Sequence, residues 1–207
     1  MIPVIIDTEI LIKQAAKKIF LRKGLAGTRL QEIADEAGIC RTALHYYFRN
    51  KEKLFETVWK DIFVTTNDIT DIFGENNLSM IQKMKMFATR HFDKSCSEPD
   101  MDMFLMNEFN NNPDAMMAIL LSGKIENPAH LLLNDIDKAV RTGEIEGEPK
   151  QIFITLLSLC IFANAGKSML KSMLGLTEKD YANLMQERLL YLHKFIETAF
   201  TPCEVCE

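Results

Sequence analysis

Apolar residues recur along this chain every three or four positions, the spacing that places side chains on one face of an α-helix. No segment of useful length alternates apolar and polar residues as a half-buried strand does. The pattern therefore predicts an all-α protein of about nine helices. They are expected at residues 7–23, 28–37, 40–47, 51–73, 78–94, 100–109, 113–141, 150–174 and 178–200, the seventh with an interruption near Gly123 or Pro128.

The second and third predicted helices form a pair joined by a tight turn. Thr28 and Gln31 suit a capping box at the start of the second helix, and Gly38 suits its end. One face of the third helix carries polar groups and a ring but no aliphatic side chain: Arg41, Thr42, His45 and Tyr46. This is the helix-turn-helix pattern, whose second helix fits the major groove of DNA. An ordinary helical hairpin can show the same spacing by chance.

The distribution of charge favours a nucleic-acid partner. Residues 1–51 contain nine Lys and Arg and five acidic residues, a net charge of +4, whereas the remainder carries −9. A basic segment joined to an acidic body is typical of a nucleic-acid-binding module attached to a part with another role. We therefore expect a DNA-binding domain over residues 1–50, called the head below, and a ligand-binding and dimerisation domain over residues 51–207.

The head also resembles the DNA-binding region of the tetracycline-repressor (TetR) family. The resemblance rests on Gly24, Thr28, Ile33-Ala34, Ala37-Gly38-Ile39 and the run from Ala43 to Phe55, about the first quarter of the chain. It implies a dimeric, nearly all-helical, one-component transcription regulator, in such families most often a repressor. The phosphate-holding residues implied are Thr28, Tyr46, Tyr47 and Lys51, and those facing bases are Arg41, Thr42 and His45. Arg29 joins this expected DNA-binding set, although Arg29, Cys40 and His45 depart from the residues common in the family.

Methionine and phenylalanine are frequent, with twelve and thirteen residues in the chain, and many lie between residues 80 and 117. Since methionine fills irregular apolar space, this run predicts an apolar effector pocket, although a Met-rich core has the same composition. Asn107 and Glu108 would supply polar groups that orient a ligand. The expected pocket residues are Phe87, His91, Phe104, Asn107, Glu108, Met116, Phe153 and Leu157. For His91, a hydrogen-bonded place in the core is the alternative.

The last two predicted helices, residues 150–174 and 178–200, are rich in apolar residues and are expected to form the homodimer interface. Leu192 and Phe195 are expected to face the partner chain. A two-fold dimer would place two reading helices on a palindromic operator. The acidic body, at −9, disfavours a phosphorylated effector, so the expected small molecule is lipophilic and either neutral or cationic.

Motifs for catalysis, metal binding or cofactor binding are not visible, so neither enzyme activity, a cofactor nor a metal is expected. Two alternatives remain, a small helical enzyme and a protein-interaction module with a basic head. The chain shows neither a secretory signal nor an apolar run of the ~18 residues that a membrane span needs, so a cytoplasmic protein without membrane contact is expected. A role for Cys40 or for the Cys203/Cys206 pair stays open.

Overall fold

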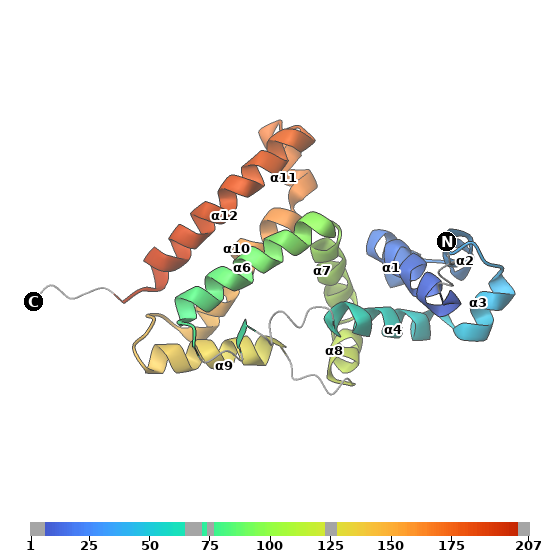
Figure 1. The fold of residues 1–207 in the computed structure, drawn as a ribbon, viewed down its shortest axis with the longest axis horizontal. Coiled ribbons are helices and arrows are strands. Elements are labelled where there is room, and N and C mark those ends of the chain that lie inside the picture. The colour runs from blue at the N-terminus through green and yellow to red at the C-terminus, as the bar shows by residue number, and fades with distance from the viewer. Residues whose placement is uncertain (1–6, 65–71, 74–76, 123–127, 203–207) are drawn as a thin grey trace, which may run out of the picture. The chain divides into compact units, whose positions relative to one another are not determined.

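The computed structural model describes residues 7–64, 72–73, 77–122 and 128–202. Its elements within these ranges are helices, without a strand, which confirms the predicted all-α class (Figure 1). They are α1 Thr8–Gly27, α2 Leu30–Glu36, α3 Arg41–Tyr47, α4 Lys51–Val64, α6 Met80–Ser97, α7 Met101–Asn111, α8 Pro113–Ser122, α9 Pro128–Arg141, α10 Pro149–Ala165, α11 Lys167–Leu174 and α12 Glu178–Phe200. Residues 65–71 of the fourth predicted helix and the Cys203/Cys206 pair lie outside the described residues.

Two predicted helices are each divided in two, so the described part of the chain holds eleven helices rather than about nine. The interruption expected near Gly123 or Pro128 falls on residues 123–127, which lie outside the described residues; α8 is described to Ser122 and α9 from Pro128. The prediction of one helix over residues 150–174 is wrong, since α10 and α11 are bent by 70°. Gly166 lies at this bend, where a Cβ atom would come within 2.9 Å of the Phe162 carbonyl oxygen.

The start of α2 also differs from the prediction. Arg29 is the N-cap, and its backbone N–H donates to the Glu32 carboxylate at 3.2 Å. The Thr28 hydroxyl donates instead to the Gly24 carbonyl at 2.7 Å, and the Gln31 amide bonds to Asp35. The expected Thr28–Gln31 capping box is therefore wrong, because the Thr28 hydroxyl is engaged by a carbonyl of the preceding turn.

The chain forms two compact units, each made of two chain segments. The first comprises Met1–Thr66 and Phe104–Lys124, with α1 packed on α4 and α2, and α8 packed on α4. An aromatic cluster lies in its core, where the Trp59 ring contacts Phe55, Phe104 and Phe109 at centroid distances of 5.5, 5.5 and 5.6 Å. The predicted domain boundary between residues 50 and 51 divides a DNA-binding part from a ligand-binding and dimerisation part, and it stays a prediction.

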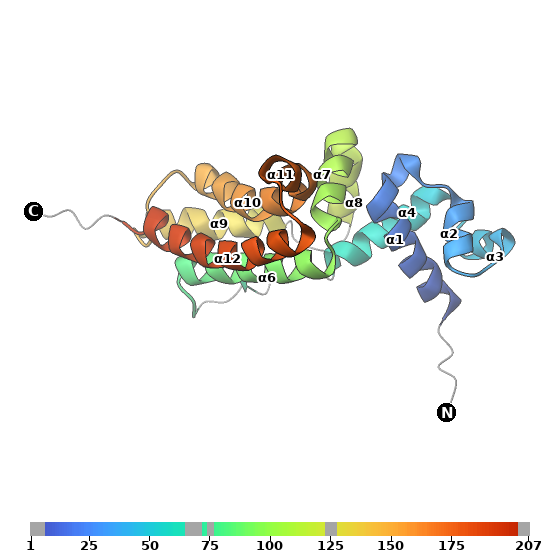
Figure 2. The same ribbon diagram turned by 90° about the horizontal axis from the view of Figure 1, so that it is seen from above.

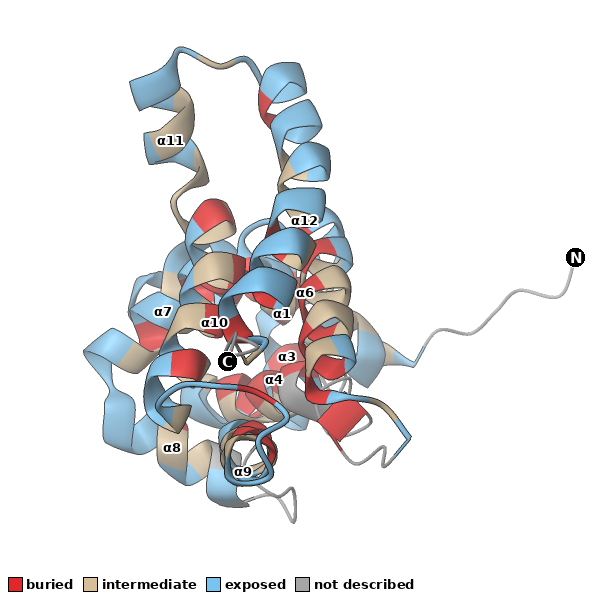
Figure 3. Cartoon of the chain, turned by 90° about the vertical axis from the view of Figure 1, so that its left-hand side faces the viewer, coloured by how far each residue is buried: buried red, intermediate tan, exposed pale blue. Residues whose placement is uncertain are grey.

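The second unit comprises Asn67–Met103 and Ile125–Glu207. In it α6 and α12 lie side by side along most of their length, with α10 and α9 also packed into the layer (Figures 1 and 2). Its core contains Met84, Phe87, Ile136, Leu156 and Ile196. By contrast, α11 has no buried residue (Figure 3). Among the described residues, no single helix is both long enough and apolar enough to cross a membrane. Helices α10 and α11 meet both conditions only when they are taken together, and they are bent relative to each other.

Candidate nucleic-acid interface and effector cavity

The third helix, α3, has one buried and one exposed face. Leu44 and the following Phe48 are 0% and 6% exposed and anchor the helix in the first unit. The opposite side is exposed and holds the five residues expected to contact DNA: Arg41, Thr42, His45, Tyr46 and Tyr47. The Tyr46 and Tyr47 rings meet edge to face at 5.4 Å. The helix therefore presents hydrogen-bonding groups and aromatic rings on a surface that a DNA groove could receive.

The turn between α2 and α3 has the local geometry that the sequence predicts. Gly38 has φ of +68°, a conformation that glycine adopts without steric cost. The Ile39 N–H donates to the Ala34 carbonyl at 3.0 Å, and the Gly38 N–H donates to the Asp35 carbonyl at 3.2 Å. These bonds satisfy carbonyls at the end of α2 and fix the tight corner that precedes α3.

Two acidic side chains of the head, Glu32 and Glu36, are paired with lysines. Lys18 forms an ion pair with Glu36, and Lys23 forms one with Glu32 at 2.6 Å. The Lys23 ammonium, followed by the Arg29 N–H, lowers the pKa of Glu32. Arg41 is exposed and forms no ion pair within the described part of the chain. The exposed face of α3 thus keeps its positive charge available for an anionic partner.

Two of the expected phosphate contacts have side chains that are bonded within the protein. Thr28 is 2% exposed and donates to Gly24, as described above. The half-buried Lys51 ammonium donates to the carbonyls of Leu25 at 2.7 Å and Thr28 at 3.2 Å. Arg29 is exposed beside them. Thr28 and Lys51 therefore hold the connection between α1 and α2, a structural task that sequence reasoning missed.

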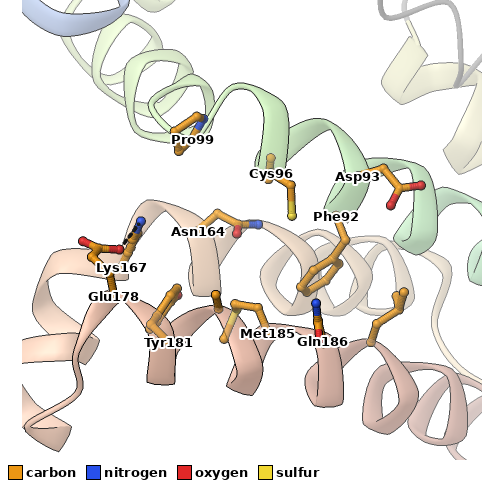
Figure 4. Close-up of a pocket in the computed structure, with 13 residues that line it drawn as sticks. Phe92, Asp93, Cys96, Pro99, Asn164, Lys167, Glu178, Tyr181, Met185 and Gln186 are labelled. Atoms are coloured by element: carbon orange, nitrogen blue, oxygen red, sulfur yellow. Dashed lines mark ion pairs between the residues drawn. The ribbon is translucent and has the colours of Figure 1, made fainter.

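A cavity of about 410 Å³ lies in the second unit, among α6, α10, α11 and α12 (Figure 4). Phe92, Met185 and Leu189 contribute apolar walls. The Asn164 amide points into the space from the end of α10, and its Nδ2 donates to the Cys160 carbonyl at 3.2 Å, which leaves the amide oxygen as an acceptor. The Lys167–Glu178 ion pair, with a distance of 2.9 Å, closes one end. This arrangement suits a mainly apolar molecule that carries a hydrogen-bond donor.

Comparison with known proteins agrees with the helix-turn-helix geometry. Residues 12–58 match the family of bacterial regulatory proteins, tetR family. Over 51 residues the chain is 45% identical to the HTH-type transcriptional regulator RutR of Escherichia coli (strain K12), covering 25% of this chain and 24% of RutR. The chain is also 22% identical over 175 residues to the HTH-type transcriptional repressor NicS of Pseudomonas putida, covering 82% of this chain and 81% of NicS.

Residues 12–58 thus carry the sequence of the TetR family. With RutR and two further relatives aligned over 49 and 59 residues, the alignment spans about a quarter of the relative's length. Two solved structures extend the likeness in fold to most of the chain. HlyIIR, a hemolysin II transcriptional regulator, gives a TM-score of 0.67 at 21% identity, covering 90% of this chain and 97% of that one. FadR from Bacillus subtilis, in complex with stearoyl-CoA, gives 0.65 at 16% identity, covering 88% and 96%.

The eight residues predicted to line an effector pocket divide between the two units of the chain. Phe104, Asn107, Glu108 and Met116 belong to the first unit, and Phe87, His91, Phe153 and Leu157 to the second. None of them lines the cavity described above. For His91, the alternative was a hydrogen-bonded place in the core. Its contacts agree with that alternative, since its Nε2 lies 3.1 Å from the buried Asp102 carboxylate.

The cavity lining was hidden from sequence reasoning because α12 supplies much of it. Tyr181, Met185 and Leu189 recur every four residues on one side of that helix, which was expected to form a dimer interface. The Tyr181 hydroxyl donates to the Ala163 carbonyl and ties α12 to α10. The four-residue spacing can be read from the sequence, but the helices that pack against this face of α12 cannot.

The last three helices expose large apolar side chains: Ile154, Phe162, Met169, Met173, Leu174, Leu184, Leu190, Tyr191 and Phe195. Phe195, expected at the dimer interface, is 43% exposed. Leu192, the other residue expected there, is 3% exposed and packs in the core of its own unit, so that expectation is wrong. Leu190 and Tyr191, in the same part of α12, are 72% and 73% exposed.

Proposed function

We propose that this chain is a DNA-binding transcription regulator that acts as a repressor. It would bind a palindromic operator as a homodimer and leave it when a small apolar effector binds. The observation that carries the proposal is the exposed face of α3, which presents Arg41, Thr42 and His45 from a helix fixed by buried Leu44. Those side chains match the donors and acceptors displayed by base edges in the major groove. The rings of Tyr46 and Tyr47 and the exposed Arg29 would contact the backbone.

The dimer in this proposal follows from the exposed apolar residues of α10–α12. Large apolar patches on a surface usually mark an interaction site, and a second copy of the chain is the partner that DNA reading requires. A groove of about 300 Å³ on this surface is lined in part by Phe162, Leu174 and Tyr191. We propose that the two copies bury these residues in a four-helix interface around a two-fold axis.

The effector would bind in the cavity of the second unit. Lys167 is the one cation in its described lining, and that ammonium is paired with Glu178. Asp93 and Glu178 give the lining a net negative charge. A phosphorylated ligand would therefore find no free positive charge in the cavity, whereas a neutral or cationic lipophile needs none. Stearoyl-CoA, the ligand named for the FadR neighbour, carries phosphates that this cavity is poorly equipped to bind.

Selection from a random-sequence duplex library tests the DNA-binding proposal. The purified chain should enrich a two-fold symmetric sequence, and Arg41→Ala should lose selectivity at one position of each half-site. Arg141→Ala serves as the control, because it removes an arginine whose side chain is 78% exposed on the second unit. If the wild-type chain enriches no duplex, even at low salt, the proposal is wrong; salt-sensitive binding to an acidic protein would then favour an interaction module.

A thermal-shift panel of lipophilic cations, neutral aromatics, fatty acids and sugar phosphates tests the effector. A ligand at a hundred times its dissociation constant should stabilise the protein by about 2.7 kcal/mol. Cys96→Phe should abolish the shift because Cys96 lines the cavity, whereas Ser97→Phe, at the next exposed position, should not. Stabilisation by sugar phosphates alone would contradict the proposed ligand class.

A further inference from the structure

Side chains distant in the sequence hold residues 24–28, the connection that runs from a kink at Gly24 inside α1 toward the start of α2. Gly24 turns the chain with φ of 68° and ψ of 176°, and its carbonyl accepts the Thr28 hydroxyl. The Lys51 ammonium donates to the carbonyls of Leu25 and Thr28. The backbone N–H of the same residue, Leu25, donates to Glu108 Oε1 at 2.9 Å. Leu25 is thus bonded through both its backbone polar groups to charged side chains.

Glu108 comes from α7, which lies 83 residues further along the chain than Leu25. It is 4% exposed, and a buried carboxylate is costly unless it accepts hydrogen bonds. The contact is also closely packed, since a Cβ atom on residue 24 would lie 2.6 Å from Glu108 Oε1. Position 24 therefore requires glycine for two reasons, its positive φ and the neighbouring carboxylate. The adjacent Asn107 is exposed.

The connection matters because the two helices after it are short. Helices α2 and α3 contain seven residues each, and helices of that length are not stable on their own in water. Their orientation must come from the connection that precedes them and from the packing around them. A carboxylate that fixes Leu25 therefore helps to fix the direction of α2 and, through the Gly38 corner, that of α3.

We propose that Glu108 is a positioning residue for DNA reading. It holds the connection 24–28 through the Leu25 N–H, and so keeps the exposed face of α3 in the orientation that recognises bases. Glu108 is buried and contacts no DNA itself. The inference rests on the proposed DNA-binding function, but the hydrogen bond that carries it is tested separately.

Amide hydrogen exchange at Leu25 tests the bond without DNA. In Glu108→Ala, exchange at Leu25 should accelerate at least about tenfold, the loss expected for a hydrogen bond to a charged group. Glu108→Gln retains an acceptor and should restore most of the protection. Asn107→Ala, on the exposed side of α7, is the control and should leave the Leu25 amide unchanged. Unchanged exchange in Glu108→Ala would overturn the proposal, as would equal acceleration in the Ala and Gln variants.

DNA binding tests the positioning role, with a duplex selected by the wild-type chain and sonicated mixed-sequence DNA as probes. Glu108→Ala should weaken binding to the selected duplex by about tenfold or more. Binding to mixed-sequence DNA and its salt slope should stay constant, because no phosphate contact is lost. Glu108→Gln should recover the selectivity. Equal weakening on both probes would reveal a general structural loss and overturn the proposal. Failure of the wild-type chain to select any duplex would instead refute the function, while the Leu25 exchange result would still stand.

Discussion

Leu190 and Leu192 offer a matched pair of substitutions on α12. Leu192 is 3% exposed and packs in the core of the second unit, whereas Leu190 is 72% exposed. Truncating a buried leucine to alanine costs about 2–5 kcal/mol, because transfer energy and cavity formation add. Leu192→Ala should therefore lower the free energy of unfolding by that amount, and the melting temperature by about 2–4 °C for each kcal/mol. Leu190→Ala, as an exposed truncation, should change the stability of the folded chain by less than about 0.5 kcal/mol.

Urea unfolding followed by far-UV circular dichroism, over a range of protein concentrations, distinguishes the two positions. The loss in Leu192→Ala should be the same at every concentration, because the residue packs within its own chain. The effect of Leu190→Ala should appear as weaker self-association in sedimentation equilibrium. Equal losses of stability in both variants, independent of concentration, would refute the assignment of Leu192 to the core and Leu190 to the interface.

Three further outcomes are expected. Arg41→Ala should lose about 1–3 kcal/mol of discrimination at one base position, and quantitative gel shifts showing equal loss on all sequences would remove it from base reading. In the folded protein, iodoacetamide should modify the exposed Cys40 and Cys96 but not Cys160, because burial raises the pKa of the Cys160 thiol to about 12. Early modification of Cys160, detected by peptide mapping, would contradict its burial. Gly166→Ala should destabilise the protein by about 1–3 kcal/mol in urea unfolding, since its methyl group meets the Phe162 carbonyl oxygen, and an unchanged midpoint would show that the bend accepts a side chain.

The sequence predicted best those features that depend on neighbouring residues. Helix α3, the Gly38 corner and the buried face of α1 follow from apolar spacing and from glycine conformation, both of which can be read within a few residues. The exposed face of α3 follows in the same way, since burial of Leu44 and Phe48 leaves Arg41 and its neighbours on the surface.

The features that were missed depend on contacts between distant segments. Glu108 was expected beside a ligand because it lies in an apolar run, yet it accepts the Leu25 N–H. Leu192 was assigned to a partner chain because spacing alone does not distinguish the packed side of a helix from its exposed apolar side. Gly166 was expected inside a helix, because the sequence does not show that a Cβ atom at this position would lie 2.9 Å from the Phe162 carbonyl oxygen. Local pattern does not reveal which neighbour a side chain will find.

The discontinuous first unit limits how the head of this chain could be exchanged for another. A segment cut after Val64 would lack Phe104, whose ring contacts Phe55 and Trp59, and would also lack Glu108. The Trp59 ring, 1% exposed in the full chain, would then lose much of its cover. A chimaera that keeps its DNA specificity would need residues 104–124 transplanted together with the N-terminal segment. A single recombination crossover between head and body would therefore separate parts of the chain that fold together. New pairings of operator and effector would be gained more readily by point substitutions on α3 than by exchange of gene segments.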